Sequence, residues 1–293
     1  MQSHDAILRF TFEDFNVRGQ IARLESTYQE VLEQCEYPDE VRILLGELLA
    51  ATALLSSTVK FSGSLSLQVN TDGRVRLLMA ECRNQADLRA IARLDETLES
   101  TSDVKLGEGK LVITIEPDDG NRYQGIVNFE QGSLARALEN YFRQSEQLNT
   151  RLWLAADARR AGGLMLQCLP PRENLPSIPV SEEDWQRVTL LAETVRNEEL
   201  LDLEASQTLT RLFHEEEVRT FDPRSLRFHC SCSRERSANA IKFLGFDDAM
   251  TLIDEQGEVQ IDCQFCHARY LFSNEDVKSV FEEEVAPRGT TIH

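Results

Sequence analysis

The chain has 293 residues, 41% of them apolar, and its 50 acidic and 31 basic residues give a formal net charge of -19. This length exceeds that of a typical single core, so we expect one large and one small unit. The acidic excess repels phosphate backbones and argues against nucleic acid as a partner. No run approaches the roughly eighteen uncharged apolar residues of a membrane span, so no membrane partner is expected.

The first residues, from Met1 to Asp5, contain no basic segment followed by an apolar run. We therefore expect no export signal. Free thiols without such a signal are typical of a reducing compartment, and the expected location is the cytoplasm.

Residues 1–175 are expected to form an N-terminal core domain of the α+β class. Alternating apolar and polar residues predict strands, and apolar residues at helical spacing predict helices. Turn residues at 70–73 and 117–120 indicate two hairpins, which favour a mainly antiparallel sheet over a doubly wound parallel one. The predicted strands are 7–12, 17–24, 61–69, 75–80, 110–115, 123–129, 151–156 and 164–169, and the predicted helices are 26–35, 38–57 and 133–144.

No catalytic residues are predicted, and we do not expect an enzyme. The five histidines are scattered, and no serine or cysteine lies in a recognisable nucleophile motif. Gly162 and Gly163 match neither phosphate-loop pattern and are interpreted as turn residues. Cys35, Cys82 and Cys168 are isolated and are interpreted as small buried core residues.

Residues 176–229 are expected to form a helical linker. Four prolines mark its start, at Pro170, Pro171, Pro176 and Pro179. Ser181 with Asp184 resembles a capping box, and apolar residues recur at helical spacing beyond it and again over residues 200–213. The segment is either an ordinary connector packed on the core domain or a conditionally stable linker that exposes its apolar face when its support is removed.

Four cysteines in residues 230–293 are the strongest chemical signal of the chain. Cys230 and Cys232 form a C-x-C pair, and Cys263 and Cys266 form a C-x-x-C pair. Two such pairs can close one tetrahedral Zn²⁺ site, and four protein ligands leave no position for a substrate. The sequence therefore predicts a structural or regulatory zinc site in an acidic C-terminal module, residues 230–293, that ends in an acidic tail. His229 and His267 flank the pairs, and each could replace a sulfur.

Three other interpretations of these cysteines are weaker. Cys263 to His267 also matches the C-x-x-C-H signature of c-type haem, which would leave Cys230 and Cys232 unexplained. A disulfide framework is unexpected without an export signal. A zinc deaminase needs a glutamate that the sequence 230–232 lacks.

The residues between the two pairs are expected to fold as a small unit of their own. Residues 237–250 suit a short helix that ends at Gly245 or a turn beyond it. Residues 250–253 and 259–263 look like the strands of a hairpin that delivers the second pair, with residues 254–257 as its turn.

Several segments resemble the heat-shock protein 33 family, the redox-regulated chaperonins. In the C-terminal module the resemblance lies in residues 230–236, 244–245, 257–259 and 263–266, followed by Tyr270 and Phe272. In the N-terminal part it lies in Phe10, residues 17–19 and the predicted helices of residues 28–55 ahead of the turn at 70–73. The resemblance spans essentially the full length and keeps the domain order.

The resemblance implies a cytoplasmic, ATP-independent holdase that binds unfolded client proteins, inactive when reduced and active, as a homodimer, after oxidation. It implies that Cys230, Cys232, Cys263 and Cys266 bind one zinc ion when reduced and form the disulfides Cys230–Cys232 and Cys263–Cys266 when oxidised. Loss of the zinc would then unfold residues 230–272 and free the apolar faces of the linker helices. The client-binding residues remain open at this point.

Two other functions use the same residues. A thiol-disulfide oxidoreductase would use Cys263 and Cys266, but no thioredoxin-like βαβ pattern surrounds them. A zinc-ribbon adaptor would bind nucleic acid or protein, and the net charge disfavours nucleic acid.

Overall fold

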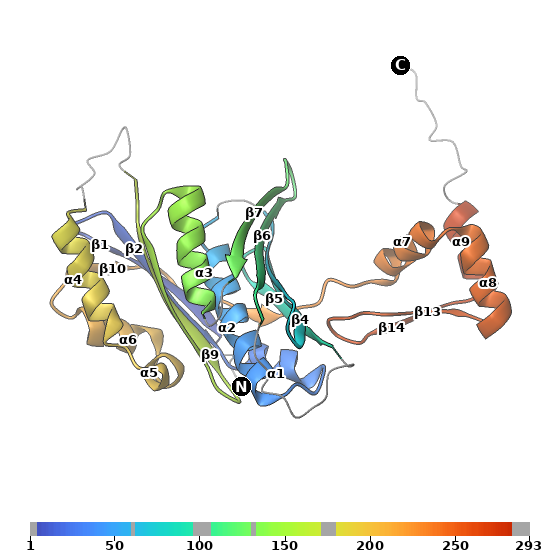
Figure 1. The fold of residues 1–293 in the computed structure, drawn as a ribbon, viewed down its shortest axis with the longest axis horizontal. Helices are drawn as coiled ribbons and strands as arrows, with labels where there is room; N and C mark the ends of the chain where they lie inside the picture. Colours follow the sequence, from blue (N-terminus) through green and yellow to red (C-terminus); the bar gives the residue numbers. More distant parts are fainter. Residues whose placement is uncertain (1–4, 60–61, 96–106, 130–132, 171–179, 283–293) are drawn as a thin grey trace, which may run out of the picture. The chain divides into compact units, whose positions relative to one another are not determined.

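The computed structural model describes residues 5–59, 62–95, 107–129, 133–170 and 180–282 (Figure 1). The chain divides into two compact units, Met1–His229 and Cys230–His293, each described by itself below. Several expected features lie outside the described residues: the domain boundary after residue 175, three of the four prolines, the acidic tail beyond residue 282 and the predicted strand start at Phe61.

The first sheet of the first unit has the strand order β10-β1-β2-β9-β8, with β11 also paired to β1. Every pairing in it is antiparallel. Its strands are β1 (Ala6–Phe12), β2 (Val17–Leu24), β8 (Thr150–Ala156), β9 (Ala161–Cys168), β10 (Val218–Thr220) and β11 (Arg224–Ser225).

The second sheet has the order β12-β5-β4-β3-β6-β7. Only the β12–β5 pair is parallel among these strands. Both predicted hairpins are present, as β3–β4 and β6–β7, and the α+β, mainly antiparallel class is confirmed. The strands are β3 (Gly63–Thr71), β4 (Val75–Arg83), β5 (Asp87–Leu94), β6 (Gly109–Pro117), β7 (Tyr123–Phe129) and β12 (Arg227–Phe228).

A long helix, α2 (Asp39–Ser56), lies between the two sheets (Figure 1). It is apolar on nearly all sides, as a helix covered from both sides must be. Before it, α1 (Ser26–Glu33) begins at the buried carboxylate of Asp5, which accepts from the amides of Glu25, Ser26 and Thr27 at 2.7, 3.2 and 2.5 Å. The helix α3 (Leu134–Tyr141) continues as a π-helical turn, η1 (Phe142–Glu146).

Glu47 lies on this buried helix, and burial raises the pKa of its carboxyl to about 7. In the unfolded chain the pKa of a glutamate is about 4.3, so folding favours the protonated form of this carboxyl. Its contribution to stability is full below about pH 4 and is lost as the pH rises to about 7. We expect Glu47→Gln to raise the free energy of unfolding by about 3.5 kcal/mol at pH 8 and by about 1 kcal/mol at pH 5, measured by urea unfolding.

Glu40→Gln is the matched control for this prediction, because Glu40 lies exposed in the first turn of the same helix. It should show no gain that grows with pH. An equal gain for Glu47→Gln at both pH values would contradict the shifted pKa.

The linker helices cover the face of the first sheet that points away from α2. They are α4 (Glu182–Glu193), α5 (Asn197–Asp202) and α6 (Ala205–Phe213). The predicted capping box of Ser181 and Asp184 is present at the start of α4. The predicted segment 200–213 is broken into α5 and α6, because Leu203 has extended backbone dihedrals.

An aromatic cluster holds α6 to the sheet. The Phe213 ring centroid lies 5.9 Å from that of Phe10 and 5.2 Å from that of Phe12, which in turn stacks on Phe15 at 4.9 Å. Gly19, on the neighbouring strand, leaves room for Phe10, since an added Cβ would lie 2.0 Å from the Phe10 Cζ atom. The linker helices therefore bury a continuous apolar surface of this sheet.

Two interpretations of single residues in the first unit are wrong. Gly162 and Gly163 are not turn residues but lie within β9, where a Cβ would meet the Leu200 carbonyl oxygen at 2.8 Å and the Leu54 side chain at 2.9 Å. Cys35 is exposed, because it follows the end of α1. Cys82 is buried as expected, and Cys168 is half-buried.

The second unit consists of α7 (Arg234–Leu244), α8 (Phe246–Gln256), the hairpin of β13 (Val259–Asp262) and β14 (Arg269–Phe272), and α9 (Asn274–Glu282). The predicted strand at residues 250–253 is wrong. These residues belong to α8, whose buried residues Ala249 and Ile253 are four apart, as on one face of a helix. Gly245, at φ 95°, separates α7 from α8.

Candidate metal centre

The two cysteine pairs are carried by two different local structures of the second unit. Cys230 and Cys232 precede α7, whose first turn is fixed by Ser233, the N-cap that accepts from the Arg236 amide at 3.2 Å. Cys263 and Cys266 lie in the turn between β13 and β14. The predicted hairpin therefore does deliver the second pair, but from its turn and with β14 as the second strand.

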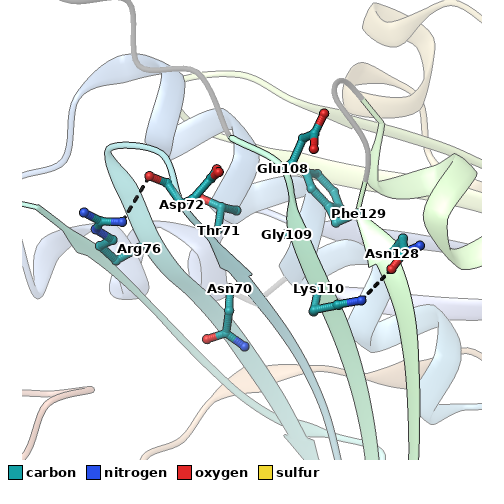
Figure 2. A pocket seen from close by; sticks show the side chains of 9 residues that line it. All are labelled: Asn70, Thr71, Asp72, Arg76, Glu108, Gly109, Lys110, Asn128 and Phe129. Atoms are coloured by element: carbon teal, nitrogen blue, oxygen red, sulfur yellow. Dashed lines mark hydrogen bonds between the residues drawn. The ribbon is translucent and has the colours of Figure 1, made fainter.

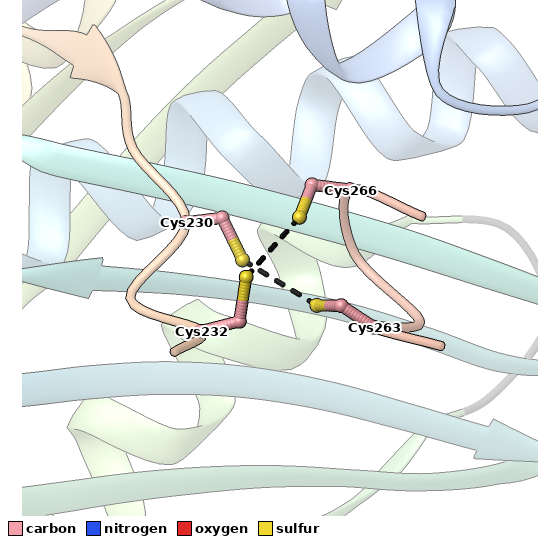
Figure 3. Close-up of side chains that lie close together, drawn as sticks. All are labelled: Cys230, Cys232, Cys263 and Cys266. Carbon is pink, nitrogen blue, oxygen red and sulfur yellow. Dashed lines mark hydrogen bonds between the residues drawn. The ribbon is translucent and has the colours of Figure 1, made fainter. Parts of the chain in front are cut away.

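Backbone hydrogen bonds shape this turn. The Cys263 amide donates to the Ala268 carbonyl at 2.9 Å, and the His267 amide donates to the Cys263 carbonyl at 2.8 Å. His267 adopts a left-handed conformation, at φ 52°, which turns the chain sharply after Cys266. Both sulfurs are thereby presented on the same side of the turn (Figure 3).

The four sulfurs converge on one point (Figure 3). Each cysteine is half-buried and outside any disulfide, and all four Sγ atoms lie within 4.8 Å of one another. The Sγ atoms of Cys230 and Cys263 are 3.6 Å apart, and those of Cys232 and Cys266 are 3.3 Å apart. Tetrahedral zinc with Zn–S bonds of about 2.3 Å places its sulfurs about 3.8 Å apart, so the spacing is compatible with one zinc ion.

Hydrogen-bond donors surround two of the sulfurs. The Tyr270 hydroxyl donates to Cys232 Sγ at 3.2 Å, and this bond raises the pKa of Tyr270 to about 12. The Ala268 amide donates to Cys266 Sγ. Burial raises the pKa of the Cys266 thiol, whereas a bound divalent cation acts in the opposite direction and holds such a sulfur as a thiolate.

Arginines brace the surroundings of the cluster. The Arg234 guanidinium lies 4.3 Å from the Phe272 ring centroid and pairs with Asp276 at 2.9 Å. The side chain of Arg236 donates to the carbonyl and hydroxyl oxygens of Ser231 at 2.9 and 2.6 Å, which fixes the loop between Cys230 and Cys232. These contacts orient the sulfur-bearing loops, as outer-shell partners do at metal sites.

The two flanking histidines take no part in the cluster of described ligand groups. His229 and His267 are both exposed. Four sulfurs and no further ligand correspond to a closed site, which suits structure or regulation and leaves no coordination position for a substrate.

Sequence reasoning found the four cysteines but not the role of Tyr270 or of the Ala268 amide. The available signal was the spacing of Tyr270 and Phe272, two residues apart, as on one face of a strand. In the hairpin, Tyr270 pairs with Ile261, two residues before Cys263. The phenol therefore lies near the sulfurs only because of a strand register that the sequence pattern did not fix.

Comparison with known proteins identifies the relatives of this arrangement. The family model described as Hsp33 protein matches residues 5–273. The chain belongs to the Hsp33 family. A 33 kDa chaperonin of Pseudomonas paraeruginosa is 49% identical over 285 residues, and one of Shewanella denitrificans is 42% identical over 283 residues; each match covers 96% of both chains.

A solved structure has a similar fold. The crystal structure of a 33 kDa chaperonin from Thermotoga maritima matches with a TM-score of 0.79 at 22% identity, over 96% of this chain and 99% of that chain. It shares the fold. The curated relatives carry the name 33 kDa chaperonin, so this Hsp33 chain is a member of a chaperone family, as the resemblance in its sequence predicted.

A depression in the first unit of this Hsp33 chain is less suited to binding a ligand than the cysteine cluster is. It measures about 1070 Å³ and lies where the β3–β4 turn meets β6 and β7 (Figure 2). The carboxylates of Asp72 and Glu108 line it, and Arg76 forms an ion pair with Asp95 at 2.5 Å. Lys110 donates to Asn128 at 2.6 Å, so little positive charge is left for an anion. Among the described residues, no helix is both long and apolar enough to span a bilayer.

Proposed function

We propose that this Hsp33 chain is a redox-regulated, ATP-independent holdase that binds unfolding proteins after oxidation. The observation that carries the proposal is the convergence of four cysteine sulfurs within 4.8 Å of one another. Zinc held there in the reduced state would stabilise the second unit, since structural zinc contributes on the order of 10 kcal/mol of apparent binding free energy. Oxidation would remove that stabilisation.

The redox step converts four zinc-bound thiolates into two disulfides. Two molecules of peroxide accept the four electrons, take up four protons from solvent and are reduced to four molecules of water, and the zinc ion is released. We propose the pairs Cys230–Cys232 and Cys263–Cys266. The alternative pairs, Cys230–Cys263 and Cys232–Cys266, would join the two ends of the unit and stabilise it, because the closed loops are much longer. Only the local pairs leave the unit free to unfold.

Release of the linker helices would expose the client-binding surface. The β10, β11 and β12 segments connect α6 to Cys230 along the chain. At the end of this connection, the backbone amide of His229 donates to the Leu88 carbonyl at 3.0 Å. We propose that this connection is lost when residues 230–272 unfold. The surface then uncovered is the apolar face of β1, β2 and β9 that α4, α5 and α6 cover in the resting state.

The other cysteines do not suit the switch. Burial raises the pKa of Cys82 to about 12 and that of Cys168 to about 11, so both are poor nucleophiles near neutral pH. Cys35 is exposed, belongs to the first unit and is not one of the four clustered cysteines. We further propose that the protein acts in the cytoplasm and that its oxidised form is a homodimer.

The test of this function combines three measurements on one preparation. Cys35→Ser is used as the background, because the exposed thiol would otherwise add to the thiol count. Peroxide with mild heat should release about one zinc per chain, consume four thiols and produce suppression of aggregation of a denatured client. Equal suppression by the reduced zinc form would remove the switch. If the protein instead catalysed insulin reduction, and Cys263→Ser abolished this activity, the function would be that of a thiol-disulfide oxidoreductase.

A further inference from the structure

A cavity of about 430 Å³ in the first unit has no assigned role. It lies between β1, β2, the end of α2 and the segment around Phe221 and Arg224. Its volume falls within the range of about 300 to 1,000 Å³ that small-molecule sites occupy. All of its lining residues belong to the first unit, so it is independent of the metal centre.

Three arginines line this cavity, Arg9, Arg18 and Arg224, and its described lining contains no carboxylate. Arg18 donates through two nitrogens to the Gln167 Oε1 atom at 3.1 and 2.5 Å. Arg224 donates to the Gln85 side chain. Both acceptors are neutral amides, and none of the three arginines forms an ion pair with a described residue. This is unusual in a chain with a net charge of -19.

The arginines also act on one another. Arg9 and Arg224 face the same space, and burial together with the charge of Arg9 lowers the pKa of Arg224. The buried Nε atom of Arg9 has no hydrogen-bond partner among the described residues. An anion between the two guanidinium groups would remove their repulsion and accept from these donors.

We propose that this cavity binds a phosphate group, either free or carried by a nucleotide, with Arg9, Arg18 and Arg224 as its ligands. The planar guanidinium fork matches phosphate oxygens and binds them in pairs of hydrogen bonds. Phe221, 40% exposed, lies at the cavity with its ring centroid 5.6 Å from the Arg9 Cζ atom. The Arg219 Cζ atom lies 5.8 Å from the same centroid, so a nucleotide base that stacks on this ring must displace one of the two guanidinium groups.

The site is assembled from two parts of the first unit. Arg9 and Arg18 lie on β1 and β2, whereas Phe221 and Arg224 lie on the segment that follows α6. The binding site is complete only while this segment stays on β1. Bound phosphate should therefore stabilise the folded first unit by mass action.

The test uses isothermal titration of the full-length reduced protein with inorganic phosphate, pyrophosphate and ADP. Adenosine, which lacks phosphate, and sodium chloride at matched ionic strength are the controls. We expect one saturable site per chain and a higher unfolding midpoint with phosphate. Arg224→Gln and Arg9→Gln should each weaken binding by about tenfold or more, since charge-assisted hydrogen bonds are lost. Tighter binding of ADP than of pyrophosphate would identify the source as a nucleotide, and equal binding would identify inorganic phosphate.

Arg122→Gln is the matched control, because Arg122 is exposed in the loop between β6 and β7. It should bind phosphate as the unchanged protein does. Without phosphate, Arg9→Gln should unfold at an unchanged or higher temperature, since it removes a repulsion. Absence of saturable binding, equal stabilisation by chloride, or an equal loss of binding in Arg122→Gln would overturn the proposal.

Discussion

Replacing Cys266 with serine is expected to leave the reduced chain without zinc and to unfold its second unit. A serine hydroxyl does not replace a thiolate ligand of zinc, and three sulfurs hold the ion far more weakly than four. Without zinc, the unit is stabilised by a small apolar core. This core is formed by Ile241, Ala249, Ile253, Val259, Phe272 and Val277. A core of this size rarely supplies more than about 3 to 5 kcal/mol, well below the contribution of a structural zinc ion.

The measurement is zinc per chain together with limited proteolysis under reducing conditions. Rapid cleavage beyond residue 229 is expected in Cys266→Ser, with the first unit resistant. Cys35→Ser is the control, because it removes an exposed cysteine that lies outside the cluster. If Cys266→Ser kept one zinc and resisted the protease as the control does, the assigned ligand set would be wrong.

Replacing Leu212 with alanine is expected to make the reduced, zinc-bound protein suppress client aggregation. Leu212 is 3% exposed and belongs to the apolar cluster between α6 and the first sheet. Truncation of a buried leucine costs about 2 to 5 kcal/mol, which shifts the equilibrium from covered to uncovered sheet by about thirtyfold or more. The variant would thus expose part of the client-binding surface without oxidation.

Leu190→Ala is the matched control, since Leu190 lies on α4 but is 62% exposed. It removes the same atoms from the same linker without loosening the contact. Both variants should retain zinc. If the Leu212 variant lost stability yet suppressed aggregation no better than the Leu190 variant, the surface beneath the linker helices would not be where clients bind.

The sequence pattern predicted those parts of the fold that depend on local signals. The turn residues at 70–73 and 117–120 lie between alternating runs, and both hairpins are present. The apolar helix around Glu47 and the capping box of Ser181 are likewise local features. The two cysteine pairs were informative for the same reason, because the ligand chemistry depends on short spacings.

Features that depend on distant partners escaped prediction. The two-residue strand β12 exists only because β5 offers it an edge, and β5 was itself not predicted. Gly162 and Gly163 resemble turn residues but serve the close approach of α5 and α2 to β9. Residues 250–253 form a short, mainly apolar segment, and such a pattern suits a strand or a helix equally well. The packing of Ala249 and Ile253 in the core of the second unit favours the helix.

The central claim is that, in the protein without linker substitutions, zinc release is what uncovers the first sheet. Trp185, on α4, packs against the cluster beneath the linker helices, and Trp153 is the only other tryptophan of the chain. In a Trp153→Phe background, zinc release and Trp185 emission should change with one time course after peroxide, and reductant with zinc should restore both. Complete zinc release with four thiols oxidised and an unchanged Trp185 emission would contradict the account.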